Sequence, residues 1–513
     1  MDNDMKAGRG VRMQAPVCER PVSVDLSSDF SLPDYQPEIK RLLRVRAVAS
    51  PAEKYVGAGN AQFSGTLDYC ILYCANDGAL YSATKTEEYQ FSVPVEMTSD
   101  FEIGEGVLCD VELLPEGASA RVAAPRKLTL RCKLRGMVRV YGIRAVEERV
   151  ETNDERSLER LCGELSSARV IAGTGDALSL ADEILFDSQW ADLRVISAEG
   201  QVLVSEAMAG SGCVNCRGDV YLKLLCCHEN GDGMPVVQLR KIPFSQSVML
   251  DGCEVNFDAC AHGVCSDLHV TVEEGRVLCD ITVRLSARAQ RNETVRYTRD
   301  LYSTTCESEN HYTPLTLLQA LGCINGNFSC NTTLSLEEAG MRGGMSVCDV
   351  TMTVMNATVE RDGDRCYLTG KCRYHLILKE GAEMSAQELE LPYRYEFSAV
   401  GDAITQYDAT VDPVSCRARV DGERISLDAE LAVCLATRGS DEVRVLSEAR
   451  MGEAIKRTSA VCTVCYPARS DTLWSVAKKY HRTVDAVSAM NSLSDSVSAD
   501  SVESLAGVAY LLV

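Results

Sequence analysis

Apolar and polar residues alternate along most of this chain, and the alternation predicts β-strands. In the stretch GTLDYCILY, which starts at Gly65, the apolar residues Leu67, Tyr69 and Ile71 occupy every second position. Successive side chains of a strand point to opposite faces, so a period of two predicts a strand that buries one face. An Asn-Asp-Gly turn follows at Asn76, and such turns suit β-hairpins because they tolerate positive φ.

This pattern occurs three times at a spacing of about 150 residues. The matching segments start at Gly65, Gly218 and Gly370, which are 153 and 152 residues apart. Each segment runs into a turn and reaches an aromatic residue, and alternating stretches precede and follow this hairpin. We therefore predict a mainly β chain with three homologous domains, each a small sandwich or a partly closed barrel. The turns start at Asn76, Glu229 and Lys379, the aromatic residues are Phe91, Phe244 and Phe397, the leading strands start at Arg44, Arg194 and Asp349, and the closing strands start at Leu128, Val277 and Ile425.

The repeats also suggest domain boundaries. The regions near 150–180 and 306–343 separate the repeats and carry some helical pattern, in SLERLCGEL and TPLTLLQAL. The predicted organisation is a flexible segment over 1–29, β domains over 30–160, 180–305 and 335–455, and a different module over 460–513.

The apolar period lengthens near the end of the chain. Leu473, Val476, Ala477 and Tyr480 recur at i, i+3, i+4 and i+7, which is the spacing of one helix face. Ser470 and Asp471 precede this stretch and can cap the helix, and Thr483 can cap a second helix that carries Val484, Val487 and Met490. Alternating stretches flank both helices, at AVCTVCY from Ala460 and at VAYLLV at the chain end. The spacing predicts a compact βααβ unit.

Charge and hydropathy exclude several classes of partner. The net charge is −22, and no basic stripe suited to nucleic-acid phosphates is visible. The same charge disfavours an anionic membrane surface. No run of 18 apolar residues occurs, so we expect no membrane span. The first residues, MDNDMKAGRGVRMQAP, lack the apolar region of a signal peptide.

The 24 cysteines are interpreted as reduced core residues. They spread over the whole chain, and many lie in strand patterns, such as Cys132 and Cys372. Two Cys-x2-Cys pairs have the spacing of zinc ligands. Cys462 and Cys465 lie in a predicted strand, which points them to opposite faces. The alternative to incidental cysteines is a zinc site built from Cys213 and Cys216, in a turn before a strand, with Cys253, Cys260 or Cys265.

Catalytic signatures are absent from the sequence. There is no GxxxxGK[ST], no GxSxG and no HExxH, and none of the six histidines forms a recognisable triad. We therefore expect a protein that is not an enzyme and that needs no cofactor and no metal.

The run DTLWSVAKKY, the second helix ending in Met490-Asn491 and the closing strand resemble a LysM domain. The resemblance implies a binding site in the loops before helix one and after helix two, where LysM domains commonly hold N-acetylglucosamine polymers. The candidate partner-binding residues are Ser470, Asp471, Thr472, Leu473, Trp474, Met490, Asn491, Ser492 and Leu493.

The three β repeats are similar to the SPOCS domain, also called DUF3794. Three such repeats followed by LysM resemble the SipL-type spore coat morphogenetic proteins. The resemblance implies a non-enzymatic scaffold in the mother-cell cytoplasm, at the forespore surface, that tethers the endospore coat to the basement-layer morphogenetic ATPase through LysM and also holds other coat proteins. The alternative is a cell-wall or cortex protein that binds peptidoglycan.

Trp474 has two interpretations. It can be a core residue of the module, or it can reach the surface, because Leu473 and its partners already fill the inward stripe. A residue one position further along a helix is turned by about 100°, and an exposed tryptophan suits an interface hot spot. Lys478 and Lys479 are expected on a solvated face, from which they could contact an acidic partner.

Overall fold

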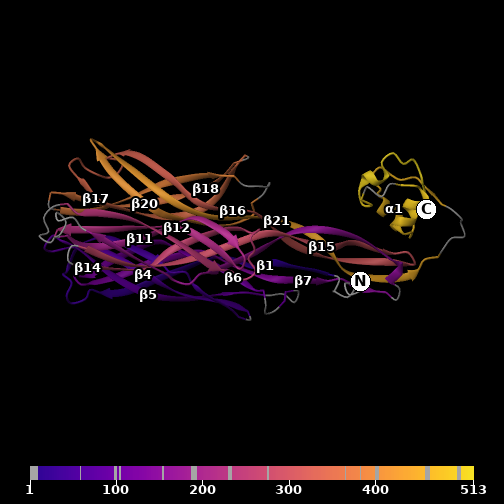
Figure 1. Cartoon of the computed structure of the whole chain (residues 1–513), viewed down its shortest axis with the longest axis horizontal. Helices are drawn as coiled ribbons and strands as arrows, with labels where there is room; N and C mark the ends of the chain where they lie inside the picture. The colour runs from indigo at the N-terminus through magenta and orange to yellow at the C-terminus, as the bar shows by residue number, and fades with distance from the viewer. Residues whose placement is uncertain are drawn as a thin grey trace.

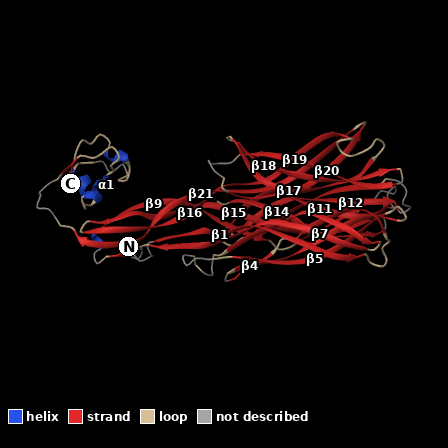
Figure 2. Cartoon of the chain, turned by 180° about the vertical axis from the view of Figure 1, so that it is seen from behind, coloured by secondary structure: helices blue, strands red, loops and turns tan. Residues whose placement is uncertain are grey.

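The computed structural model confirms that the chain is mainly β (Figure 1, Figure 2). In the described part, no helix is both long and apolar enough to cross a membrane. The described residues are 10–57, 59–96, 101–102, 106–152, 155–185, 193–228, 234–273, 276–363, 365–381, 383–398, 404–456, 463–493 and 498–513.

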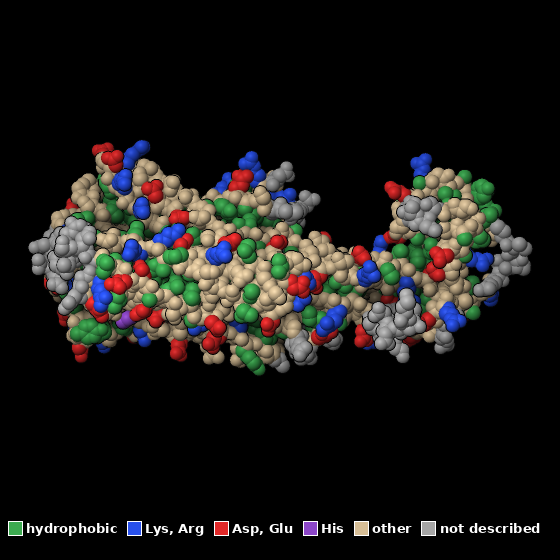
Figure 3. Space-filling view, in the orientation of Figure 1, with side chains coloured by type: hydrophobic (Ala, Val, Ile, Leu, Met, Phe, Trp, Pro, Cys, Tyr) green, Lys and Arg blue, Asp and Glu red, His purple; other side chains and the backbone are tan. Residues whose placement is uncertain are grey.

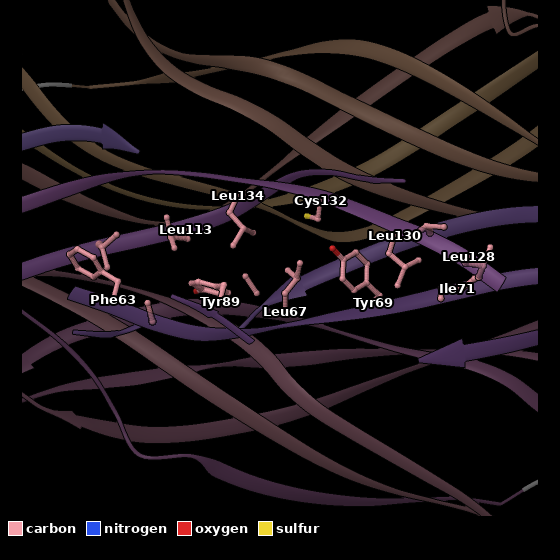
Figure 4. Packing of buried hydrophobic residues seen from close by; sticks show 14 of the residues in the cluster. Phe63, Leu67, Tyr69, Ile71, Tyr89, Leu113, Leu128, Leu130, Cys132 and Leu134 are labelled. Carbon is pink, nitrogen blue, oxygen red and sulfur yellow. The ribbon is translucent and has the colours of Figure 1, made fainter. Parts of the chain in front are cut away.

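Two sheets enclose one hydrophobic cluster in the first unit of the structure. Side chains from both sheets point toward each other, as Figure 4 shows for Tyr69 on one sheet and Leu130 and Cys132 on the other. Alternating residues of these strands are buried, as the period of two predicts. One sheet has the order β1-β7-β6, and in the other β4 lies between β5 on one side and β2 and β3, one after the other, on the other side. The strands are β1 (Gly10–Ser31), β2 (Ile39–Ala49), β3 (Glu53–Gly57), β4 (Asn60–Ala75), β5 (Leu80–Pro94), β6 (Leu108–Ala124) and β7 (Lys127–Glu147).

The second and third units repeat this plan. In each, the long closing strand is the central strand of one sheet. It pairs on one edge with the strand or strands that begin the unit, and on the other edge with the strand that precedes it in the chain. A second sheet of three antiparallel strands covers the same core. The second unit has β9 (Leu158–Thr174), β10 (Leu178–Leu185), β11 (Leu193–Gly210), β12 (Cys213–His228), β13 (Val236–Met249), β14 (Asp258–Glu273) and β15 (Arg276–Ser303). The third has β16 (Cys306–Ser335), β17 (Ser346–Asp362), β18 (Arg365–Glu380), β19 (Glu383–Phe397), β20 (Gln406–Asp421) and β21 (Arg424–Ala454), and the short β8 (Arg149–Glu151) pairs in parallel with β21.

The segments before and between the repeats are strands, and the expectation of a flexible segment over 1–29 is wrong. The residues from Gly10 onward form β1, which pairs with β7 along nearly its whole length. The helical patterns near 150–180 and 306–343 belong to β9 and β16, which pair with β15 and β21. A partner strand supplies hydrogen bonds along the whole segment, and this outweighs a weak local helical period. Each unit therefore begins about 20–30 residues before the predicted boundary. The turn expected at Glu229 lies outside the described residues.

The units lie side by side in an elongated body that narrows toward one end (Figure 1, Figure 3). The long strands β15, β16 and β21 extend into the narrow end, and the helical C-terminal module lies beside it. The body thus presents one small, structurally different module at a single end.

Buried charges join the three units. Arg44 of β2 contacts Glu199 of β11 at 2.7 Å and Asp349 of β17 at 2.6 Å, so each unit contributes one group. All three side chains are almost completely buried. Burial alone lowers the pKa of Arg44, but the two carboxylates outweigh burial and raise it. A buried charge is tolerated only when it is paired and hydrogen-bonded, so the units must stay in this mutual arrangement.

A second buried group connects β6, β14, β15 and β20. Arg288 contacts Asp110 at 2.6 Å and Glu112 at 2.8 Å. His262 lies between two carboxylates, with Nδ1 2.7 Å from Glu112 Oε1 and Nε2 2.7 Å from Asp412 Oδ2. Burial lowers the pKa of His262, but Asp412 and Glu112 outweigh burial and raise it to about 10. The imidazole is therefore protonated at neutral pH and links all three units.

A third buried group connects the first and third units. The Asp408 carboxylate of β20 pairs with Arg139 of β7, and it contacts Arg438 Nη1 of β21 at 2.8 Å. Arg438 has no exposed side-chain surface, and Arg139 and Asp408 are 6% and 5% exposed. Asp408 thus contacts two buried guanidinium groups, and Arg139 also pairs with Glu19 at 2.9 Å.

Cysteines serve mostly as core residues, and those in the described residues are free thiols. Cys132 and Cys372 belong to the cores of the first and third units. Burial raises the pKa of each thiol to about 12. A thiol rather than a thiolate is a poor nucleophile and reacts slowly with oxidants and disulfides.

Thiol titration should find nearly all 24 cysteines free in protein that is denatured after purification under conditions that block oxidation. The physical reason is that a buried, protonated thiol does not exchange with disulfides. Recovery of several disulfides would contradict the interpretation of these residues as reduced core residues.

Candidate partner-binding site in the terminal module

The terminal module has the predicted order of strand, helix, helix and strand. The two short strands pair antiparallel, with Val464 opposite Leu512. A 3-10 turn precedes the last strand. The elements are β22 (Val464–Cys465), α1 (Leu473–Lys479), α2 (Val484–Met490), η3 (Val502–Leu505) and β23 (Leu511–Leu512). Cys462, which the sequence pairs with Cys465, lies outside the described residues.

The N-cap of the first helix is the residue that directly follows the two expected caps. Thr472, not Ser470 or Asp471, is the N-cap, and its hydroxyl accepts a hydrogen bond from the Ser475 amide. Ser475 Oγ accepts in return from the Thr472 amide at 2.9 Å, which completes a capping box. Asp471 instead accepts from the Ala468 amide at 2.8 Å, which holds the preceding turn. Thr483 caps the second helix, as predicted.

The predicted inward stripe of the first helix is confirmed. Leu473, Val476 and Ala477 are buried, and Tyr480 is half-buried. They pack with Val487 of α2 and with residues of both strands in one cluster. The same cluster includes Tyr302 of β15, so the apolar core of the module is continuous with the end of that strand.

The loop after the second helix is tied to the last strand. Asn491 donates to Leu512 O and accepts from the Leu512 amide, both at 2.8 Å. Ser492 has a positive φ of 51°, and Met490 is 48% exposed. Leu493 packs against the cluster that contains Leu473, so the structure brings the apolar residues of the two predicted loops together. Asn491 has a structural role that spacing alone did not indicate.

Trp474 is buried, and a different part of the chain covers it. Only 6% of the residue is exposed. Its ring lies edge-on to Tyr302 of β15, with centroids 4.8 Å apart. Its Nε1 donates to Asp300 Oδ2 at 2.9 Å. Of the two interpretations, the buried one is confirmed, and the end of β15 covers the indole.

Neighbouring residues of the module contact the same strand end. Lys478 Nζ lies 2.7 Å from both carboxylate oxygens of Asp300. The Tyr302 hydroxyl donates to Arg482 O at 2.7 Å, and His481 Nδ1 lies 3.0 Å from Ser303 O. Lys478 is partly exposed and pairs with an acidic group, as the alternative expectation allowed, and that group belongs to the same chain. Lys479 is exposed.

The charge of Asp300 is stabilised where it meets the module. Burial raises the pKa of this carboxyl, but the hydrogen bonds from Lys478 and Trp474 outweigh burial and lower it. Asn310 Nδ2 and the Tyr312 hydroxyl of β16 also donate to Asp300, at 2.9 and 3.0 Å. The sequence shows no sign that Asp300 and Tyr302 belong to this site, because they precede the module by more than 150 residues.

The zinc alternative finds no support in the structure. Cys213 and Cys216 lie within β12 rather than in a turn before it. No group of three or more histidine, cysteine, aspartate or glutamate side chains in the described ranges could hold a metal ion.

Comparison with known proteins found no match to the chain among the protein-family models, the curated proteins or the solved structures.

Proposed function

We propose that this chain is a non-enzymatic scaffold of endospore coat assembly that tethers the coat to its basement layer. One observation carries the proposal: buried ion pairs hold three repeated two-sheet units in one body, and a different, small module lies at one end. Such a body can hold partners along its length while the module contacts another layer. Repeated units also raise avidity without tight individual contacts.

The proposal treats the three units as homologous SPOCS-like domains and the terminal module as LysM-like. The equivalent strand order in the three units supports the first part. The strand-helix-helix-strand order supports the second. In the proposed setting, the mother-cell cytoplasm at the forespore surface, the module binds the polymerising morphogenetic ATPase and the repeated domains hold other coat proteins.

Trp474→Glu should weaken binding of the full chain to its basement-layer partner by about 2–4 kcal/mol, as for interface hot spots, or on the order of 30-fold or more. The reason is that a charge replaces the aromatic contact at the centre of the proposed site. Pull-down from sporulating lysate followed by titration with the purified partner measures the change. Lys479→Glu is the matched control, since this residue lies exposed on the same helix.

Two results would contradict the proposal. Retention of the chain by peptidoglycan with no protein partner would favour a glycan-binding protein. Unchanged partner binding by a folded Trp474→Glu chain would place the interface elsewhere. Circular dichroism of the variant establishes whether the chain is folded.

A further inference from the structure

The end of β15 lies on the module as a bound ligand would. Asp300 and Tyr302 are two residues apart on a strand, and both contact the module. Asp300 meets the indole N–H and the Lys478 ammonium, and Tyr302 meets the indole edge and a backbone carbonyl. We name the module surface formed by Trp474, Lys478, His481 and Arg482 the Trp474 face.

The Trp474 face is specific in its chemistry. Two donors converge on one carboxylate, and charge-assisted hydrogen bonds of this kind are the strong ones. An edge-on aromatic pair adds about 0.5–1.5 kcal/mol beyond area burial. Both groups come from one extended segment, so the face recognises an acidic residue followed two positions later by an aromatic residue.

The contact can also be released. The side chains of Lys478 and Asp300 remain 37% and 20% exposed, so solvent screens the ion pair between them. The segment Asp300 to Tyr302 occupies the face mainly because it belongs to the same chain. This linkage raises its effective concentration at the face to about the millimolar range. A partner segment with the same chemistry and additional contacts can therefore displace it.

We propose that the Trp474 face is a receptor for an extended acidic-x-aromatic segment, and that Asp300 to Tyr302 of the same chain occupy it and keep it closed to partners. The identity of the partner that replaces this segment rests on the proposed function, whereas the occupancy of the face by the chain's own segment does not. The face then opens when a partner presents the same pattern, so assembly is limited to places where that partner is concentrated.

Charge reversal tests the occupancy in the full chain. The probe is a fluorescein-labelled peptide of residues 296–304, RYTRDLYST, and binding is measured by fluorescence anisotropy. Asp300→Lys should release the face and bind the peptide at least tenfold more tightly than the unaltered chain. Lys478→Glu should fail to bind this peptide and bind the version with lysine in place of aspartate. The double variant should close the face again and bind the lysine peptide at least tenfold more weakly than Lys478→Glu does.

Glu396→Lys is the matched control, because Glu396 forms an exposed ion pair with Arg365 in the third unit. It should bind the peptide as weakly as the unaltered chain. Equal peptide affinity of the unaltered and Asp300→Lys chains would overturn the proposal, as would a double variant that stays open. Because the probe contains no coat component, failure of the proposed function would leave these results unchanged. If both proposals hold, Asp300→Lys strengthens retention of the coat partner, whereas Trp474→Glu weakens it.

Discussion

Replacing Asp408 with alanine should lower the free energy of unfolding by about 3–5 kcal/mol, the usual cost of removing one partner of a buried ion pair. Asp408 contacts both Arg139 and Arg438, and Arg438 is completely buried. Without Asp408, the buried Arg438 loses its carboxylate, while Arg139 keeps its contact with Glu19. Urea denaturation monitored by circular dichroism measures the change.

Two further variants separate charge from packing. Glu396→Ala removes a carboxylate from an exposed pair and should cost less than about 1 kcal/mol. Replacing Arg139, Asp408 and Arg438 together by methionine, leucine and methionine should recover much of the loss, because an apolar replacement leaves no buried charge. A loss below about 1 kcal/mol in Asp408→Ala would show that these arginines are not held in a buried site.

Raising the pH from 7 to 10 should destabilise the chain through His262 by on the order of 3 kcal/mol. The folded pKa of His262 is raised to about 10, whereas an unfolded histidine has a pKa of about 6.5. The folded state therefore binds the proton more tightly. The contribution is fully present below pH 6.5 and is lost as the pH rises through 10.

His262→Gln isolates this contribution from other groups that titrate over the same range. The difference in unfolding free energy between the unaltered chain and His262→Gln should be largest below pH 6.5 and should shrink toward pH 10. His269→Gln is the matched control, because His269 lies exposed on the same strand. A difference that stays constant with pH would mean that His262 is not charged between Glu112 and Asp412.

Asp408→Ala and His262→Gln each remove a buried charged group that joins the units. Their effects therefore bear on the proposed scaffold. A body that loses its buried pairs should let its units move relative to one another. Partner binding by the terminal module should then persist, because the cluster that holds the module includes Tyr302 of β15 and no residue of the Asp408 group. Loss of the module contact in Asp408→Ala would indicate that the body and the module act as one binding surface.

The period of two and the three-fold repeat were sufficient to predict the β character and the hairpins of the three units. In the strand from Gly65, Leu67, Tyr69 and Ile71 are fully buried, because a half-buried strand must repeat its apolar residues at every second position. The helical period likewise indicated both helices of the module. These features are local, and their physical cause is visible within a few residues of sequence.

Partners that are distant in sequence decided the rest. β9 and β16 are strands because β15 and β21 supply their hydrogen bonds, whatever their local pattern favours. Trp474 is buried because Asp300 and Tyr302 cover it, and no spacing along the chain encodes that contact. The sequence by itself determined which segments are strands or helices wherever their own periodicity was strong. Only the tertiary structure decided which charges are buried and which face of the module is covered, because both depend on groups that folding brings together.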